Sequence, residues 1–175
     1  MTATSAPRGW VWGPLSRLGL ATALVTLALD QANKWWMLDI YRIGERGRVA
    51  ITPFLDFLYV KNIGISYSLF GQASYEGQLM LASFGVLATC ALWAWLARGG
   101  TGRLMAVSLG LIMGGAIGNA IDRVRLGGVA DFFSLHAFGF YWYVFNIADV
   151  AIVAGVAGLL YDSFVASRKD AAKPL

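Results

Sequence analysis

Asp149 is a carboxylate within a stretch of apolar residues, 143–161, that carries no other charge. An ionisable side chain at membrane depth costs on the order of a few kcal/mol unless it is paired or reaches water, so it is by default a functional residue. Asn146 lies three positions earlier and therefore shares its helix face. If the helix begins near Tyr143, Asp149 lies about 9 Å below its start, at 1.5 Å per residue. We therefore predict a hydrogen-bonded carboxylate near one membrane surface.

A second polar group in the sequence repeats the spacing of Asn146 and Asp149. Asn119 and Asp122 lie at the end of another uncharged stretch, and Arg123 follows directly. Asp131 comes nine residues after Asp122, behind two adjacent glycines. We interpret this segment as a loop flexible enough to bring Asp131 back toward the helices.

Carboxylates of this kind can carry out hydrolysis as a pair. Two carboxylates held close together in a poorly solvated site share one proton. The ionised partner can take a proton from water while the protonated partner polarises a carbonyl, as in aspartic proteases. The chain offers few parts for other hydrolytic mechanisms, because it has one His, one Cys within an apolar stretch, and no Ser in a nucleophile motif.

The composition places these residues in a membrane protein. Of the 175 residues, 58% are hydrophobic and only 14% are charged, against roughly 25% charged in a soluble domain. The aromatic content of 14% excludes disorder, and a single Cys excludes a disulfide framework. The net charge of +4 comes without any run of like charge, so we expect no nucleic-acid partner.

Charge-poor windows of the length needed to cross a bilayer predict an all-α integral membrane protein with four transmembrane helices. The windows are residues 15–38, 77–97, 104–121 and 143–161. Residues 39–75, between the first two helices, are rich in β-branched and aromatic residues around 49–60, which predicts a small extracytoplasmic β-rich segment. We expect one membrane domain over 15–165, with tails at 1–14 and 166–175.

Four crossings place both termini on one side of the membrane. Arg8 and Arg17 precede the first helix and favour the cytoplasm for that side, although the count of basic residues in all segments is equal on the two sides. Most of the acidic residues fall on the opposite side or in that half of the membrane. We therefore expect cytoplasmic termini and a site near the outer face.

The chain resembles the lipoprotein signal peptidases, also called signal peptidase II, over about residues 15 to 165. Boxes that match the family occur in the family's order and spacing: Asp30–Lys34, Asn62–Gly64, Gly118–Arg123 with Gly128–Phe132, and Phe145–Asp149. Residues Ile65, Ser66 and Tyr67 depart from the pattern, because small Ala residues are more usual there, so the resemblance does not extend to the local substrate contacts.

This resemblance implies that Asp131 and Asp149 are the catalytic pair of an aspartic endopeptidase without a metal or organic cofactor. The implied substrate is a diacylglyceryl-modified prolipoprotein, cut on the N-terminal side of its lipidated cysteine in the bacterial cytoplasmic (inner) membrane. We expect a monomer in contact with membrane lipid. Residues expected to line or brace the site are Asp30, Lys34, Asn62, Gly64, Asn119, Asp122, Arg123 and Asn146, with Asp122 paired to Arg123 or another base.

The residues alone leave other interpretations open. Asp30 and Lys34 have the i, i+4 spacing that stabilises the end of any helix. Asp122, Asp131 and Asp149 could hold Mg²⁺ in an enzyme acting on a lipid-linked phosphate. Asp30 and Asp149 could also form the relay of a small proton- or ion-conducting protein.

Overall fold

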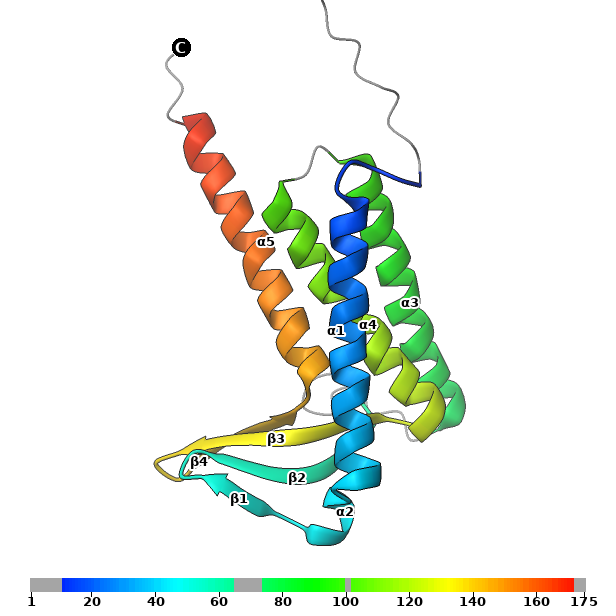
Figure 1. Cartoon of the computed structure of the whole chain (residues 1–175), viewed down its shortest axis with the longest axis vertical. Helices are drawn as coiled ribbons and strands as arrows, with labels where there is room; N and C mark the ends of the chain where they lie inside the picture. Colours follow the sequence, from blue (N-terminus) through cyan, green and yellow to red (C-terminus); the bar gives the residue numbers. More distant parts are fainter. Residues whose placement is uncertain (1–10, 65–73, 100–101, 172–175) are drawn as a thin grey trace, which may run out of the picture.

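The computed structural model describes residues 11–64, 74–99 and 102–171 and consists of a helical bundle with a sheet at one end (Figure 1). The N-terminal segment 1–10, the tail end 172–175 and the departure at Ile65, Ser66 and Tyr67 lie outside the described residues. The helices are α1 (Ser16–Trp35), continued by the π-helix η1 (Trp36–Ile40), the short α2 (Ile43–Arg46), α3 (Tyr75–Arg98), α4 (Arg103–Leu126) and α5 (Ile147–Ala171).

Within the described residues, three helices are long and apolar enough to cross a membrane: α3, α4 and residues Ile147–Val165 of α5. These agree with three of the predicted windows. The helix α1 has 20 residues but includes Arg17, Asp30 and Lys34, and it does not reach the same apolar character. Its role as a fourth span therefore stays a prediction.

The sheet has four antiparallel strands in the order β1-β2-β3-β4. Strands β1 (Val49–Thr52) and β2 (Leu55–Asn62) lie in the predicted β-rich segment, whereas β3 (Val129–Ala137) and β4 (Phe140–Phe145) come from the segment between α4 and α5. The interpretation of Asp131 as a loop residue was therefore wrong, because Asp131 pairs with Val60 inside the sheet.

The last helix begins at Ile147 and not near Tyr143, because the residues before it pair with β3. Asp149 therefore lies in the first turn of α5 and not about 9 Å below the start of a helix. A run of uncharged aromatic residues satisfies the hydropathy of a membrane span, but Phe133 pairs with Phe145 and Ala137 with Phe140 as hairpin partners. Strand pairing thus removes the first residues of the predicted span.

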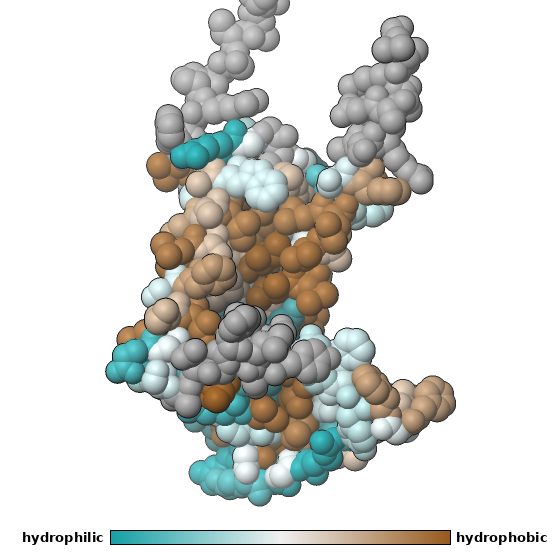
Figure 2. Space-filling view, turned by 180° about the vertical axis from the view of Figure 1, so that it is seen from behind, coloured by the Kyte–Doolittle hydropathy of each residue, from teal (hydrophilic) through white to brown (hydrophobic). Residues whose placement is uncertain are grey.

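Helix α4 is the centre of the bundle. It is the most buried of the three apolar helices, while few residues of α3 and α5 are buried inside the protein. Figure 2 shows an apolar surface over the helices, and more hydrophilic residues around the sheet end. Gly110 and Gly114 let α4 approach the backbone of α1, since a Cβ on Gly114 would lie 2.5 Å from the carbonyl oxygen of Ala23. Such small-residue contacts allow close helix packing in lipid.

We predict that Gly114→Ala lowers the stability of the protein in detergent. The added methyl group must push α1 away from α4, and overpacking of this kind costs about 1–3 kcal/mol. Gly85→Ala is the matched control, because a Cβ there would meet the carbonyl oxygen of Ala116 at 3.4 Å, an ordinary contact. The measurement is the midpoint temperature of thermal unfolding of each variant. Equal midpoints in Gly114→Ala and Gly85→Ala would contradict the packing argument.

Candidate active site

Asp149 is fixed by the start of its own helix. Asn146 precedes the first helical residue and accepts a hydrogen bond on Oδ1 from the backbone N–H of Asp149 at 2.9 Å. In return, Oδ2 of Asp149 accepts the backbone N–H of Asn146 at 3.2 Å. This reciprocal pattern is a capping box, which satisfies two free N–H groups at a helix N-terminus. The spacing of three positions noted in the sequence thus has a structural cause.

Amide side chains connect Asp149 to Asp131. The Nδ2 of Asn146 donates to Oδ1 of Asp131 at 2.7 Å and to Oδ1 of Asn119 at 3.2 Å. Asn119 in turn donates to Oδ1 of Asp149 at 2.9 Å. Asn62 on β2 donates to the other oxygen of Asp131 at 3.2 Å. The two carboxylates, from a strand and a helix, are therefore held by one network.

Lys34 lies next to this network and binds two further carboxylates. Its Nζ is 2.8 Å from Oδ2 of Asp30 and 2.7 Å from Oδ2 of Asp122. All three side chains are almost fully buried. The sequence offered Arg123 or another base as the partner of Asp122. The partner in the structure is the second alternative, Lys34.

Arg123 connects the network to the end of β2. Its guanidinium donates to the carbonyl oxygens of Asn119 at 3.1 Å and of Gly64 at 2.8 Å. Gly64 is buried, and its N–H donates to Oδ1 of Asn62. The structure therefore brings all ten predicted site residues into one connected region at the junction of bundle and sheet.

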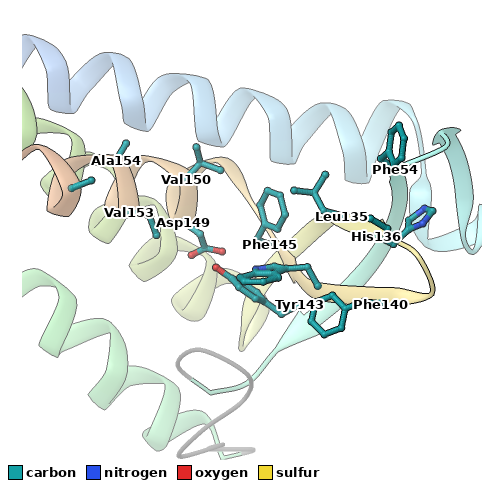
Figure 3. A pocket seen from close by; sticks show the side chains of 13 residues that line it. Phe54, Leu135, His136, Phe140, Tyr143, Phe145, Asp149, Val150, Val153 and Ala154 are labelled. Atoms are coloured by element: carbon teal, nitrogen blue, oxygen red, sulfur yellow. The ribbon is translucent and has the colours of Figure 1, made fainter.

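Two residues of this region were missed by sequence reasoning. Gln31 donates through Nε2 to Asp30, to Asp122 and to the carbonyl oxygen of Gly118. Its position inside the Asp30–Lys34 box was the available signal. Tyr143 lines both cavities that reach Asp149, and Figure 3 shows it beside that carboxylate. Nothing in the sequence separated Tyr143 from its aromatic neighbours.

Two cavities meet at Asp149, which is half-buried and borders both. The larger, of about 660 Å³, lies between the β3–β4 hairpin and α5, and apolar side chains make up most of its wall (Figure 3). The smaller, of about 280 Å³, lies among α3, α4 and α5 and also contains Asn62, Asn119 and Arg123. An apolar ligand can therefore reach a polar, carboxylate-bearing centre from the side of the bundle.

Burial sets the charge state of Asp131. It raises the pKa of this carboxyl to about 7, and the negative charge of Asp149 adds to the increase. The hydrogen bonds from Asn146 and Asn62 and the charge of Lys34 oppose the increase without cancelling it. A neutral carboxyl beside a second carboxylate is the arrangement that lets two such groups share a proton.

Comparison with known proteins places the chain in a family. The family model described as signal peptidase (SPase) II matches residues 22–165. The chain belongs to the signal peptidase II family. Family membership indicates a membrane peptidase.

Individual relatives and solved structures agree with this assignment. A lipoprotein signal peptidase of Methylobacterium sp. (strain 4-46) is 53% identical and covers 89% of this chain and 94% of its own length. That of Methylocella silvestris is 51% identical over 86% of this chain and 88% of its own. A bacterial membrane enzyme solved by the in meso method at 1.9 Å matches with a TM-score of 0.71 and 26% identity, over 83% of this chain and 92% of that one. The sequence similarity to lipoprotein signal peptidases and the fold similarity to a bacterial membrane enzyme thus each extend over most of the molecule.

We predict that Lys34→Met destabilises this signal peptidase II more than Asp122→Asn does. The first change leaves Asp30 and Asp122 buried without their cation, and breaking a buried pair costs about 3–5 kcal/mol. The second removes one charge and leaves Lys34 paired with Asp30. Thermal unfolding in detergent at one pH would give the order, and a smaller loss in Lys34→Met would show that the ammonium group is not the stabilising element.

The raised pKa of Asp131 also predicts that the free energy of unfolding depends on pH. Because its pKa rises from 3.8 to about 7 on folding, the folded state binds more protons than the unfolded state within that window. Stability must then fall as the pH rises through the window, with the full penalty above pH 7. Asp131→Asn removes the penalty, so its unfolding temperature relative to wild type should be higher at pH 8 than at pH 5. A difference that does not change with pH would contradict the raised pKa.

Proposed function

We propose that this signal peptidase II is an aspartic endopeptidase with Asp131 and Asp149 as its catalytic pair. The observation that carries the proposal is the double contact of Asn146, whose amide donates to Asp131 while its backbone N–H donates to Asp149. One residue thereby holds two carboxylates from different elements around a common space. The cavities that border Asp149 give a substrate access to that carboxylate, and Asp131 lies buried behind it in the same hydrogen-bond network.

The proposed chemistry divides the roles between the two carboxyls. Asp131, with its pKa raised to about 7, carries the shared proton and donates a hydrogen bond to the scissile carbonyl. Asp149 is stabilised as an anion by N–H groups of Asn119 and Asn146, and it takes a proton from the attacking water. The tetrahedral intermediate then collapses: the C–N bond breaks as Asp149 gives the proton taken from water to the leaving amine, and the C=O bond re-forms. The network of amides keeps both carboxyls in place during this exchange.

The substrate that we propose is a diacylglyceryl-modified prolipoprotein, cut on the N-terminal side of its lipidated cysteine. The relatives are lipoprotein signal peptidases by name. A signal-peptide helix and acyl chains both partition into lipid, and both cavities at Asp149 have mainly apolar walls. The enzyme requires no metal or organic cofactor in this mechanism.

We further propose that α1 is a fourth span, with residues 15–165 forming one membrane domain of a monomer. The start of α1 and the end of α5 lie at the same end of the bundle, opposite the sheet (Figure 1). With both tails in the cytoplasm, the sheet and Asp149 lie at the outer face of the bacterial inner membrane. Lys34 and Asp30 need no contact with lipid in this arrangement, because both are buried inside the bundle.

The contacts disfavour the two alternative functions. Asp122 is occupied by Lys34 and by the N–H of Ala130, and no group of three potential ligands suited to a metal occurs within the described residues. Asp30 is likewise bound by Lys34 and by the N–H of Ala148, which leaves it poorly placed as one end of a proton relay.

We predict that Asp131→Asn and Asp149→Asn each remain folded but lose nearly all cleavage, since neither half of an acid–base pair replaces the other. The measurement is a gel-shift assay of purified protein in lipid with a diacylglyceryl-modified prolipoprotein. Asp39→Asn, a change at an exposed carboxylate, is the matched control and should cleave as wild type does.

Added chelator separates the alternatives in the same assay. Cleavage that resists chelator and is lost in both aspartate variants supports the aspartic mechanism. Full activity in either variant refutes the pair, and cleavage abolished by chelator means that the carboxylates hold a metal. A proton flux in liposomes that disappears in Asp149→Asn, without any cleavage by wild type, would favour the relay.

A further inference from the structure

The turn of the β3–β4 hairpin contains an aromatic residue, Phe138, in an unfavourable backbone conformation. Ala137 and Phe140 form the closing pair, and the two residues between them, Phe138 and Gly139, have φ angles of 52° and 82°. Two-residue turns of this kind favour Asn, Asp or Gly, because both positions need positive φ. The side chain of Phe138 is fully exposed, at 106% of its reference area. No contact with the described protein offsets the strain at this residue.

The whole hairpin shares this apolar and exposed character. Phe140, Tyr141 and Trp142 on β4 and Leu135 on β3 each expose about half or more of their area, from 46% to 63%. Between Asp131 and Asp149 the chain has no Lys, Arg, Asp or Glu. Strand β4 is also an edge of the sheet. In water, an exposed, uncharged, aromatic edge strand is a site of aggregation, which proteins normally prevent with charges.

The position of the hairpin indicates what covers it. β4 ends at Phe145 and the apolar helix α5 begins at Ile147, so the strand leads directly into a span. Figure 1 shows the hairpin extending sideways from the end of the bundle, across the direction of the helices. Six residues of strand reach about 20 Å at 3.3 Å per residue. The tip therefore lies to the side of the bundle and beyond the start of α5 (Figure 1).

The larger cavity joins the hairpin to the lipid-facing side of α5. Its wall includes Phe140 and Trp142 of β4 together with Val150 and Val153, which are exposed on α5. Apart from Asp149 and His136, the wall of this cavity is apolar or aromatic from α5 onto the sheet. Trp and Tyr are the residues that favour the boundary between headgroups and acyl chains.

We propose that the tip of the β3–β4 hairpin, Phe138 with its neighbours on β4, inserts into the lipid bilayer at its interface with water. The occupant of this surface is phospholipid, with the Phe138 ring among the upper acyl chains and Trp142 at headgroup level. The hairpin thereby anchors the sheet to the membrane beside the bundle. This inference concerns the placement of the sheet and does not depend on the catalytic roles of Asp131 and Asp149.

Site-directed fluorescence in liposomes tests the insertion. Cys90 is first replaced by Ala, and a polarity-sensitive fluorophore is attached to a new cysteine in Phe138→Cys or Phe140→Cys. Glu45→Cys is the matched control, because Glu45 is exposed on α2, on the far side of the sheet from the bundle (Figure 1). Liposomes contain phosphatidylcholine with or without brominated acyl chains, and iodide serves as the aqueous quencher.

We expect the labels at 138 and 140 to lose most of their fluorescence to brominated lipid and to be protected from iodide, with blue-shifted emission. The label at 45 should show the reverse. Equal quenching of all three labels by iodide would overturn the proposal. Disulfide cross-links between two copies through position 138, without quenching by brominated lipid, would overturn it in favour of a second copy of this chain.

Discussion

The structure depends on one buried ammonium group, that of Lys34, which is shared by Asp30 of α1 and Asp122 of α4. Each carboxylate also accepts a backbone N–H from an element that carries a catalytic candidate. Asp30 accepts that of Ala148 at the start of α5, and Asp122 accepts that of Ala130 in β3. The positions of Asp149 and Asp131 are therefore set one residue away from this charged cluster. Because removing one partner from a buried pair leaves an uncompensated charge, the cluster tolerates little displacement.

This cluster requires a close approach of the α4 backbone, which explains why the residue there, Gly118, has no side chain. A Cβ on Gly118 would lie against Oδ2 of Asp30. Only a residue without a side chain lets α4 pass this carboxylate while Asp30 also reaches the N-terminus of α5. The same proximity brings the charge of Lys34 near Asp131, where it lowers the pKa that burial raises. Packing and electrostatics at the site are thus two effects of one arrangement.

Sequence reasoning predicted the features that depend on local pattern. The uncharged windows predicted α3 and α4. The spacing of Asn146 and Asp149 predicted that their side chains lie together, and they do so through the capping box, although Asn146 precedes the helix. Sequence reasoning did not predict β3, because the two glycines before Asp131 favoured a loop, and it did not predict β4, because the hydropathy of an uncharged aromatic run suits a membrane span as well as a strand. The pairing of Lys34 with Asp122 joins distant parts of the chain and has no local signature. The family resemblance, and not the spacing, singled out Asp131.

Asn146 shows why the junction between sheet and bundle needs one residue type. The N–H of Asp149 fixes Oδ1 as the acceptor and so directs Nδ2 toward Asp131. An aspartate could cap α5 equally well, but it has no donor for a second carboxylate and would add a third negative charge. A glutamine has the donor, but its longer side chain disfavours the N-cap position. The residue that ends the sheet and begins α5 is therefore also the one that can connect the two carboxyls, so the strand–helix boundary and the site are a single structural feature.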